Sequence, residues 1–146
     1  MTRNNLDNPI FLFMLLLFAV LLNAISSVYF ILIMLSGLLF IAFFVCLKRK
    51  YLYSLFFIVI AFLFIEANSG LKPLSLTLLS LFLYIFVLPK INRTVSFSSL
   101  NAYIYITIFY LGLLFVWSLS ADINEAMVKA IVLNIMIDLV LFGVLI

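Results

Sequence analysis

The sequence predicts an all-α, polytopic membrane protein, and its composition and the spacing of its apolar runs both support this prediction. Of the 146 residues, 69% are hydrophobic and 9% are charged, whereas soluble domains carry about 25% charged residues. A soluble domain of about 150 residues leaves about 30% of its unfolded surface exposed to water, so a chain this apolar needs lipid around it. Residues 1–146 are therefore expected to form a single transmembrane domain.

A helical hairpin in the middle of the chain indicates how the chain crosses the membrane. Two apolar runs, residues 51–65 and 74–88, are separated by a short polar turn and flanked by basic residues. Lys and Arg collect in cytoplasmic loops, so both ends of the hairpin are expected on the cytoplasmic side. Five residues are the expected topology anchors: Lys48, Arg49, Lys50, Lys90 and Arg93.

Four further apolar runs complete a prediction of six transmembrane helices. Pro9 suits the first turn of a helix, where its missing N–H is not needed. Residues 23–26 are a poor signal-peptidase site, so the first span is expected to be retained. Residues 89–99 are polar enough to form a loop outside the bilayer. The six helices are expected at residues 9–24, 28–47, 51–65, 74–88, 100–119 and 125–146.

The distribution of basic residues predicts the orientation of these helices. With a cytoplasmic N-terminus, the cytoplasmic segments carry six basic residues, Arg3 and the five anchors. The opposite side carries two, Lys72 and Lys129. This bias predicts that both termini are cytoplasmic, an N-in/C-in arrangement.

Asp138 is the residue least suited to its surroundings, because it lies near the middle of the last apolar run. An acidic side chain at the centre of a membrane helix costs about 2.5 to 3.5 kcal/mol on insertion scales. Asn134 lies four residues earlier and shares a helix face with Asp138, so the two form a polar stripe that is expected to face other helices. An interhelical clasp, a contact with a partner's helix, a proton or substrate site, and solvation at the interface all fit this stripe.

Two small residues of the second predicted helix could allow a neighbouring helix to come close. Ser36 and Gly37 lie at the centre of that helix, and small residues are enriched where membrane helices pack together. The candidate intramembrane partner contacts are therefore Asn134, Asp138, Ser36 and Gly37.

The turn of the hairpin holds the second set of candidate residues. Glu66 ends the third helix, where a carboxylate opposes the helix dipole, so we expect a compensating ion pair with Lys72. Gly70 can adopt a positive φ and end the helix, and Asn68 and Ser69 can hydrogen-bond backbone groups. All five are candidate periplasmic contacts, although an ordinary polar turn also explains them.

The sequence lacks the residue sets that most enzymes use. It has no His and one cysteine, Cys46, so it lacks the commonest metal ligand and proton shuttle and cannot form an internal disulfide. It also has no glycine-rich phosphate loop and no serine with a histidine base. We therefore expect a non-enzymatic protein without cofactor or metal. The net charge of +3 does not indicate nucleic acid, and membrane lipids are the expected surroundings.

Several of these features resemble the MreD family of rod-shape-determining proteins, which are small proteins of the bacterial inner membrane. The features are the basic loop at residues 47–50, the acidic residue and Ser-Gly turn at 66–70, the start of the fourth helix at 73–75, and Asn134 in the last helix. Glu66 stands where the family usually has Asp, and residues 51–65 lack the glycines usual in that helix.

The resemblance implies a non-enzymatic, multi-pass subunit of the cell-elongation machinery. Such a subunit binds the bitopic protein MreC and helps couple the MreB filaments to peptidoglycan synthesis by RodA and its transpeptidase. An assembly subunit of another envelope machine is one alternative. Another is the substrate-binding membrane subunit of a vitamin importer, whose polar pocket would use residues on the outer side: Glu66, Asn68, Lys72, Trp117 and Asp122.

Overall fold

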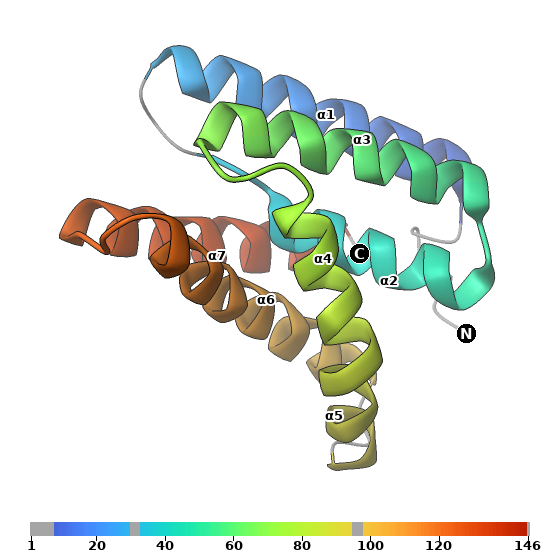
Figure 1. The fold of residues 1–146 in the computed structure, drawn as a ribbon. Coiled ribbons are helices and arrows are strands. Elements are labelled where there is room, and N and C mark those ends of the chain that lie inside the picture. Colours follow the sequence, from blue (N-terminus) through green and yellow to red (C-terminus); the bar gives the residue numbers. More distant parts are fainter. Residues whose placement is uncertain (1–7, 30–32, 95–97, 146) are drawn as a thin grey trace.

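The computed structural model describes residues 8–29, 33–94 and 98–145, which form helices joined by short non-helical segments and contain no strand. This confirms the predicted all-α class. Figure 1 shows the elements in chain order: α1 (Pro9–Val28), α2 (Ser36–Arg49), α3 (Leu52–Ser69), α4 (Ser75–Phe82), a π-helical turn η2 (Leu83–Val87), α5 (Leu88–Thr94), α6 (Ser98–Ser120) and α7 (Glu125–Leu145).

Five helices in the described part of the chain are long and apolar enough to cross a membrane, so the chain is a multi-pass membrane protein. They span Pro9–Val28, Leu52–Ser69, Ser75–Thr94, Leu100–Ser120 and Glu125–Leu145. Helix α2 is not among them. Its 14 residues extend about 21 Å at 1.5 Å per residue, against about 30 Å for the bilayer core.

The predicted bounds of the second helix are therefore wrong. We expected a full-length span at residues 28–47, but α1 continues to Val28 and α2 begins only at Ser36. Residues 33–35 just before α2 are not helical, yet Met34 and Leu35 are buried. Non-helical backbone at membrane depth is tolerated only where protein or water satisfies it, so the surroundings of this segment are of particular interest.

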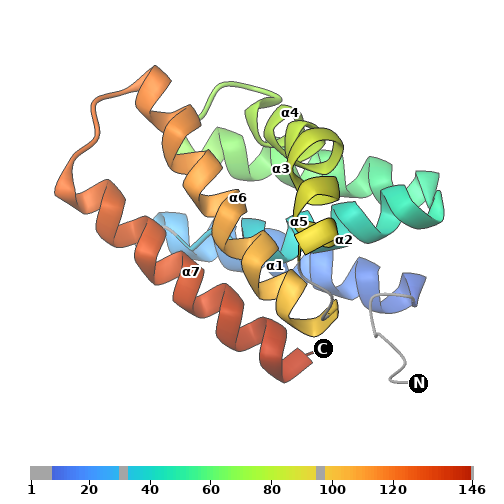
Figure 2. The same ribbon diagram turned by 90° about the horizontal axis from the view of Figure 1, so that it is seen from below.

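The two ends of α1 and of α3 lie at opposite sides of the molecule, whereas the segment of α4, η2 and α5 runs across their direction (Figure 1). Helices α1 and α3 lie side by side and run in the same direction, and α2 runs back beneath them (Figure 1). The starts of α1 and α3 lie at one end, whereas the ends of α1 and α3 and the α6–α7 turn lie at the other (Figures 1 and 2).

Helix α2 is the centre of the packed core. Residues 38–43 are all buried, as expected of a helix that is covered on every side. It packs against α3 and α6, where the Phe40 and Phe109 rings stack at 4.9 Å and the Phe43 and Phe62 rings lie 6.1 Å apart. Helix α2, which is too short to cross the bilayer core by itself, is thus enclosed by the rest of the bundle.

Helices α4 and α5 join through η2 into one continuous rod, which passes through Pro89. We expected a loop at residues 89–99, but the rod continues to Thr94. Proline has no N–H to bond the carbonyl four residues earlier, and its ring clashes with that carbonyl. Here that carbonyl belongs to Ile85, which lies inside the widened π-turn, where the N–H of Leu88 bonds the carbonyl of Leu83. A π-turn thus accommodates the proline without ending the helix.

Candidate functional site

The buried start of α2 collects the polar side chains that the sequence analysis singled out. The residue before the helix, Leu35, has a φ of 50° in the left-handed region, and no side chain of its own caps the helix. The first N–H groups of a helix have no partner within the helix. In a buried position they need acceptors from elsewhere, since an unpaired buried N–H is costly.

Asp138 of α7 supplies the main acceptor. Its Oδ2 accepts hydrogen bonds from the N–H of Gly37 at 2.8 Å and of Leu38 at 3.3 Å, and from the hydroxyl of Tyr110 at 2.6 Å. Asp138 and Tyr110 are both completely buried. A carboxylate at a helix N-terminus also interacts favourably with the helix dipole, so this contact stabilises α2 in two ways.

Asn134 extends the same contact by one turn of α7. Its Oδ1 accepts a hydrogen bond from the N–H of Met34 at 2.7 Å, and its Nδ2 donates to the carbonyl of Ala130 at 2.8 Å. The predicted polar stripe of Asn134 and Asp138 therefore faces other helices, as expected. Its partner is the backbone of this chain's own residues 34–38, so the interhelical clasp is the interpretation that fits the geometry.

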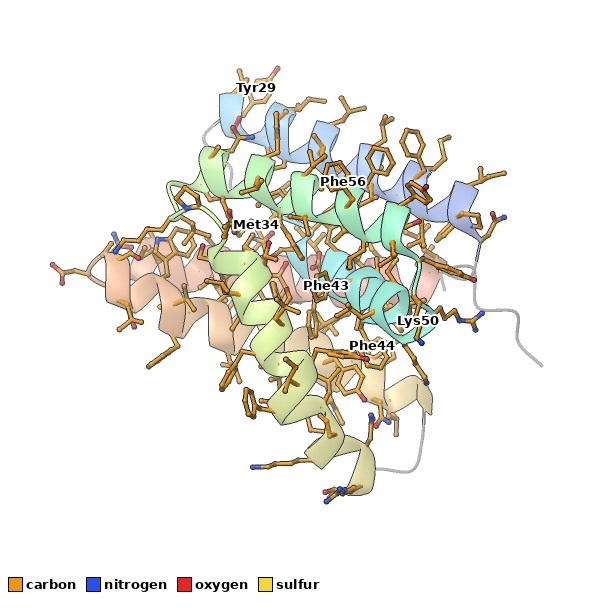
Figure 3. All side chains as sticks on the ribbon, turned by 45° about the vertical axis from the view of Figure 1, so that its right-hand side comes forward. Tyr29, Met34, Phe43, Phe44, Lys50 and Phe56 are labelled. Atoms are coloured by element: carbon orange, nitrogen blue, oxygen red, sulfur yellow. The ribbon has the colours of Figure 1, made fainter. Side chains whose placement is uncertain are left out.

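Side chains of α1 bond the other side of the same segment, and a side chain of α3 bonds one of them. The Nδ2 of Asn23 donates to the carbonyl of Ile33 at 2.8 Å, and the hydroxyl of Ser26 donates to the same carbonyl at 3.4 Å. Asn68 donates in turn to the Oδ1 of Asn23 at 2.9 Å. Figure 3 shows Met34 in the interior of the bundle, between these helices and α7. Helices α1 and α7 thus bond one short stretch of non-helical backbone directly, and α3 bonds the α1 side chain that does so.

Gly37 is the point of closest approach between α2 and its neighbours. A Cβ at this position would lie 2.6 Å from Asp138 Oδ2 and 2.8 Å from Tyr110 Cε2, closer than real contacts allow. Ser36, beside it, is also fully buried. The expectation that Ser36 and Gly37 mark a close helix contact agrees with this geometry, although the contact lies within the chain.

Glu66 caps a second helix, α4, in a similar way. Its Oε2 accepts from the N–H of Leu74 at 2.7 Å and its Oε1 from the N–H of Leu76 at 2.6 Å. The expected ion pair between Glu66 and Lys72 is wrong: among the described residues no such pair forms, because both carboxylate oxygens bond backbone N–H groups instead. Gly70 ends α3 with a φ of 73°, as expected.

The remaining predicted residues lie on the surface or at helix ends. The five basic anchors are exposed: Lys48, Arg49, Lys50, Lys90 and Arg93. The Lys48 ammonium lies 5.9 Å from the centre of the Phe44 ring. Ser69 ends α3 with its hydroxyl buried and without a hydrogen-bond partner in the described part of the chain.

Sequence reasoning missed three members of the cluster, Tyr110, Asn23 and Ser26. Tyr110 lies in an aromatic-rich run, where nothing distinguishes it from core residues. Asn23 and Ser26 lie where the first predicted helix was expected to end, but α1 continues to Val28. Within the described residues, no group of three His, Cys, Asp or Glu side chains could hold a metal ion. The polar atoms of the cluster mostly bond each other or backbone, so the arrangement fixes the position of α2.

The five candidate pocket residues of the importer alternative do not line one polar cavity. Glu66 is buried and engaged with α4, Asn68 bonds Asn23, and Lys72 and Asp122 are exposed. A cavity of the described structure lies elsewhere, between α1 and α3, and is lined by apolar side chains. The chain matches no protein-family model, no curated protein and no solved structure.

Proposed function

We propose that this chain is a non-enzymatic subunit of the bacterial inner membrane that works in the cell-elongation machinery, as the MreD family does. In this proposal it binds a bitopic, MreC-like partner and helps organise peptidoglycan synthesis by RodA and its transpeptidase. The observation that supports a scaffold is the use of the polar groups inside the bundle. Asp138, Asn134 and Asn23 bond the backbone around the start of α2, which gives a fixed core beneath an apolar outer surface.

The same observation disfavours the importer subunit. In transporters with interrupted helices, the N-terminus of a half-helix points at an anionic group of the substrate. Here the chain's own Asp138 occupies the start of α2. An anionic substrate would have to displace a buried carboxylate that holds three hydrogen bonds.

The proposed topology has six crossings, with both termini in the cytoplasm. The second crossing would consist of α2 together with the segment before it, since α2 returns toward the end of the molecule where α1 begins (Figure 1). The basic residues at the ends of α2 and α5 would then be cytoplasmic, in line with the positive-inside rule. Thiol labelling from outside tests this: a cysteine at the exposed Asn124 should react and one at the exposed Asn92 should not.

Co-purification from native membranes tests the function itself. We expect mass spectrometry of the protein isolated in mild detergent to find an MreC-like protein, RodA or its transpeptidase. A matched control is an unrelated multi-pass protein of similar size from the same membranes. Recovery of ATPase subunits or a bound vitamin would contradict the scaffold, and recovery of another envelope machine would contradict the elongation assignment.

A further inference from the structure

Residues 33–35, just before α2, adopt a backbone conformation that their own sequence does not favour. Leu35 has a φ of 50°, in the left-handed region that bulky residues rarely adopt, and its side chain is buried. All three residues are large and apolar, within a run whose pattern predicts a helix over residues 28–47. Strained backbone of this kind persists only where the surrounding structure holds it. The segment is therefore a candidate for a second conformation.

One added turn of helix would satisfy the same N–H groups that Asp138 now holds. In the described structure the N–H groups of Gly37 and Leu38 bond the Oδ2 of Asp138 at 2.8 and 3.3 Å. In an α-helix each N–H bonds the carbonyl four residues earlier. With an added turn before α2, Gly37 and Leu38 would bond the carbonyls of Ile33 and Met34 instead, and Asp138 would be released.

Side chains of α1 oppose this change. The carbonyl of Ile33 accepts hydrogen bonds from Asn23 at 2.8 Å and from Ser26 at 3.4 Å. A carbonyl oxygen has two lone pairs, so it would have to give up one of these donors to accept a helical bond. The added turn thus relieves the strain at Leu35 and loosens the contact with α1. These two effects act in opposite directions on the same segment.

We propose that the start of α2 is a switch with two states, and that the thickness of the bilayer shifts the balance between them. In the described state α2 has 14 residues, fewer than the roughly 17 that the shortest membrane spans have. In the second state residues 33–35 add a turn of about 4.5 Å and bring α2 to that length. A thicker bilayer favours a longer apolar helix. The rest of α2 keeps its position in both states.

Carbon NMR of the methionines tests the proposal in the intact protein. The chain has 5 methionines, and the Cα resonance of Met34 is identified by its loss in Met34→Leu. Its chemical shift distinguishes helical from non-helical backbone. The resonance should move toward the helical value from dimyristoleoyl to dioleoyl to dierucoyl phosphatidylcholine bilayers. The ratio of the second state to the described one should rise by about three- to ten-fold, because mismatch costs a fraction of a kcal/mol for each Å. Met14 and Met136 lie within α1 and α7 and are internal controls.

Two variants set the switch independently of the bilayer. Asp138→Leu/Tyr110→Phe removes the competing acceptor and its third donor at nearly constant shape, so Met34 should be helical in all three lipids. The matched control is Tyr110→Phe alone, which keeps Asp138 and should still respond to bilayer thickness. Leu35→Gly suits the left-handed conformation and should hold Met34 in its described, non-helical conformation in every lipid.

Three outcomes would overturn the proposal. The first is a Met34 resonance that keeps its non-helical value in all three bilayers. The second is an equal shift at Met14 and Met136, because the whole bundle and not the start of α2 would then respond to the lipid. The third is a non-helical Met34 in Asp138→Leu/Tyr110→Phe, since Asp138 would then not compete with the added turn. The inference does not depend on the proposed scaffold role, because it concerns the length of one helix.

Discussion

The starts of α2 and α4 are both hydrogen-bonded by a carboxylate of another helix, but the two carboxylates lie at very different distances along the chain. Each helix follows a leucine with positive φ, 50° at Leu35 and 65° at Leu74, and each receives hydrogen bonds from a carboxylate on another helix. Glu66 reaches α4 from 8 to 10 residues away, whereas Asp138 reaches α2 from about 100 residues away. The start of α4 is therefore a local feature of the α3–α4 hairpin. The start of α2 is instead bonded by a helix that is distant in the sequence, α7.

Replacing Asp138 by alanine is expected to have the largest effect of the changes considered. In a buried site, the N–H of Leu38 and the hydroxyl of Tyr110 would lose this acceptor, and the N–H of Gly37 would keep only the longer bond of 3.4 Å to the Tyr110 hydroxyl. Each buried unsatisfied group costs about 1 to 3 kcal/mol, so we expect a loss of about 3 kcal/mol or more. Thermal unfolding in detergent measures it, with Cys46 as the reporter, because this single, buried cysteine of α2 reacts with a thiol-specific dye only on opening.

Two further variants define what Asp138 contributes. Asp122→Ala removes an exposed acid and should change stability by less than about 0.5 kcal/mol. Asp138→Asn keeps a carbonyl oxygen at the same reach and should lose less stability than Asp138→Ala. If the two changes at Asp138 are equally harmful, the side chain is needed for its charge and not as an acceptor for α2.

Replacing Glu66 by alanine should have a smaller and more local effect. It leaves the N–H groups of Leu74 and Leu76 without acceptors, and Leu74 is half exposed, so we expect a loss of about 1 to 3 kcal/mol. Hydrogen exchange should increase at Leu76 and remain unchanged at Gly37 and Leu38. Faster exchange at the start of α2 as well would show that the two starts are coupled, which contradicts the local role of Glu66. The matched control is Glu125→Ala, which removes an exposed acid at the start of α7, paired with Lys129 at 3.9 Å.

The same contrast explains which parts of the structure the sequence could predict. The helical class, the multi-pass character and the helix-ending role of Gly70 follow from composition and local pattern. Asp138 and Asn134 were found because polar groups are costly in a membrane helix, and their orientation toward other helices follows from that cost. Their actual partner, the backbone of residues 34–38, could not be predicted, because no sequence pattern connects α7 to a segment about 100 residues away.

Two predictions from local sequence patterns, the second helix and the Glu66–Lys72 ion pair, were wrong because tertiary contacts favour another structure. Residues 28–47 are apolar throughout much of their length and therefore predict one full helix. Asn23 and Asn134 bond the backbone of the interruption before Ser36, and Asp138 bonds the first N–H groups of α2 that follow it. Glu66 and Lys72 carry opposite charges within one turn, which predicts an ion pair, but two backbone N–H groups of α4 compete for the same carboxylate and occupy both of its oxygens.

Replacing Tyr110 by phenylalanine should have a moderate effect that depends on Asp138. The variant removes one of three donors to Oδ2 while keeping the aromatic ring in the core, so we expect a loss of about 1 to 1.5 kcal/mol. In an Asp138→Ala background the same change should cost much less, because the acceptor has already gone. A double-mutant cycle measures this coupling. Equal costs in both backgrounds would show that the hydroxyl does not stabilise the start of α2 through Asp138.

Replacing Leu74 by glycine should have the smallest effect, and it should be stabilising. A left-handed conformation costs a non-glycine residue about 1 to 2 kcal/mol, and glycine relieves this cost while losing about 0.5 to 1 kcal/mol through its freer unfolded chain. Leu74 is half exposed, so little packing is lost, and we expect a net gain of about 0.5 kcal/mol in thermal unfolding. The control is Leu78→Gly, one turn into α4 and also exposed, which should lose about 1 kcal/mol. Leu35 has the same strain but is buried, so glycine there should destabilise the protein. If Leu74→Gly destabilises the protein as much as Leu78→Gly does, the left-handed conformation of Leu74 carries no strain that glycine can relieve. The hydrogen bonds from Glu66 would then be the feature that sets the start of α4 apart from an ordinary helix position.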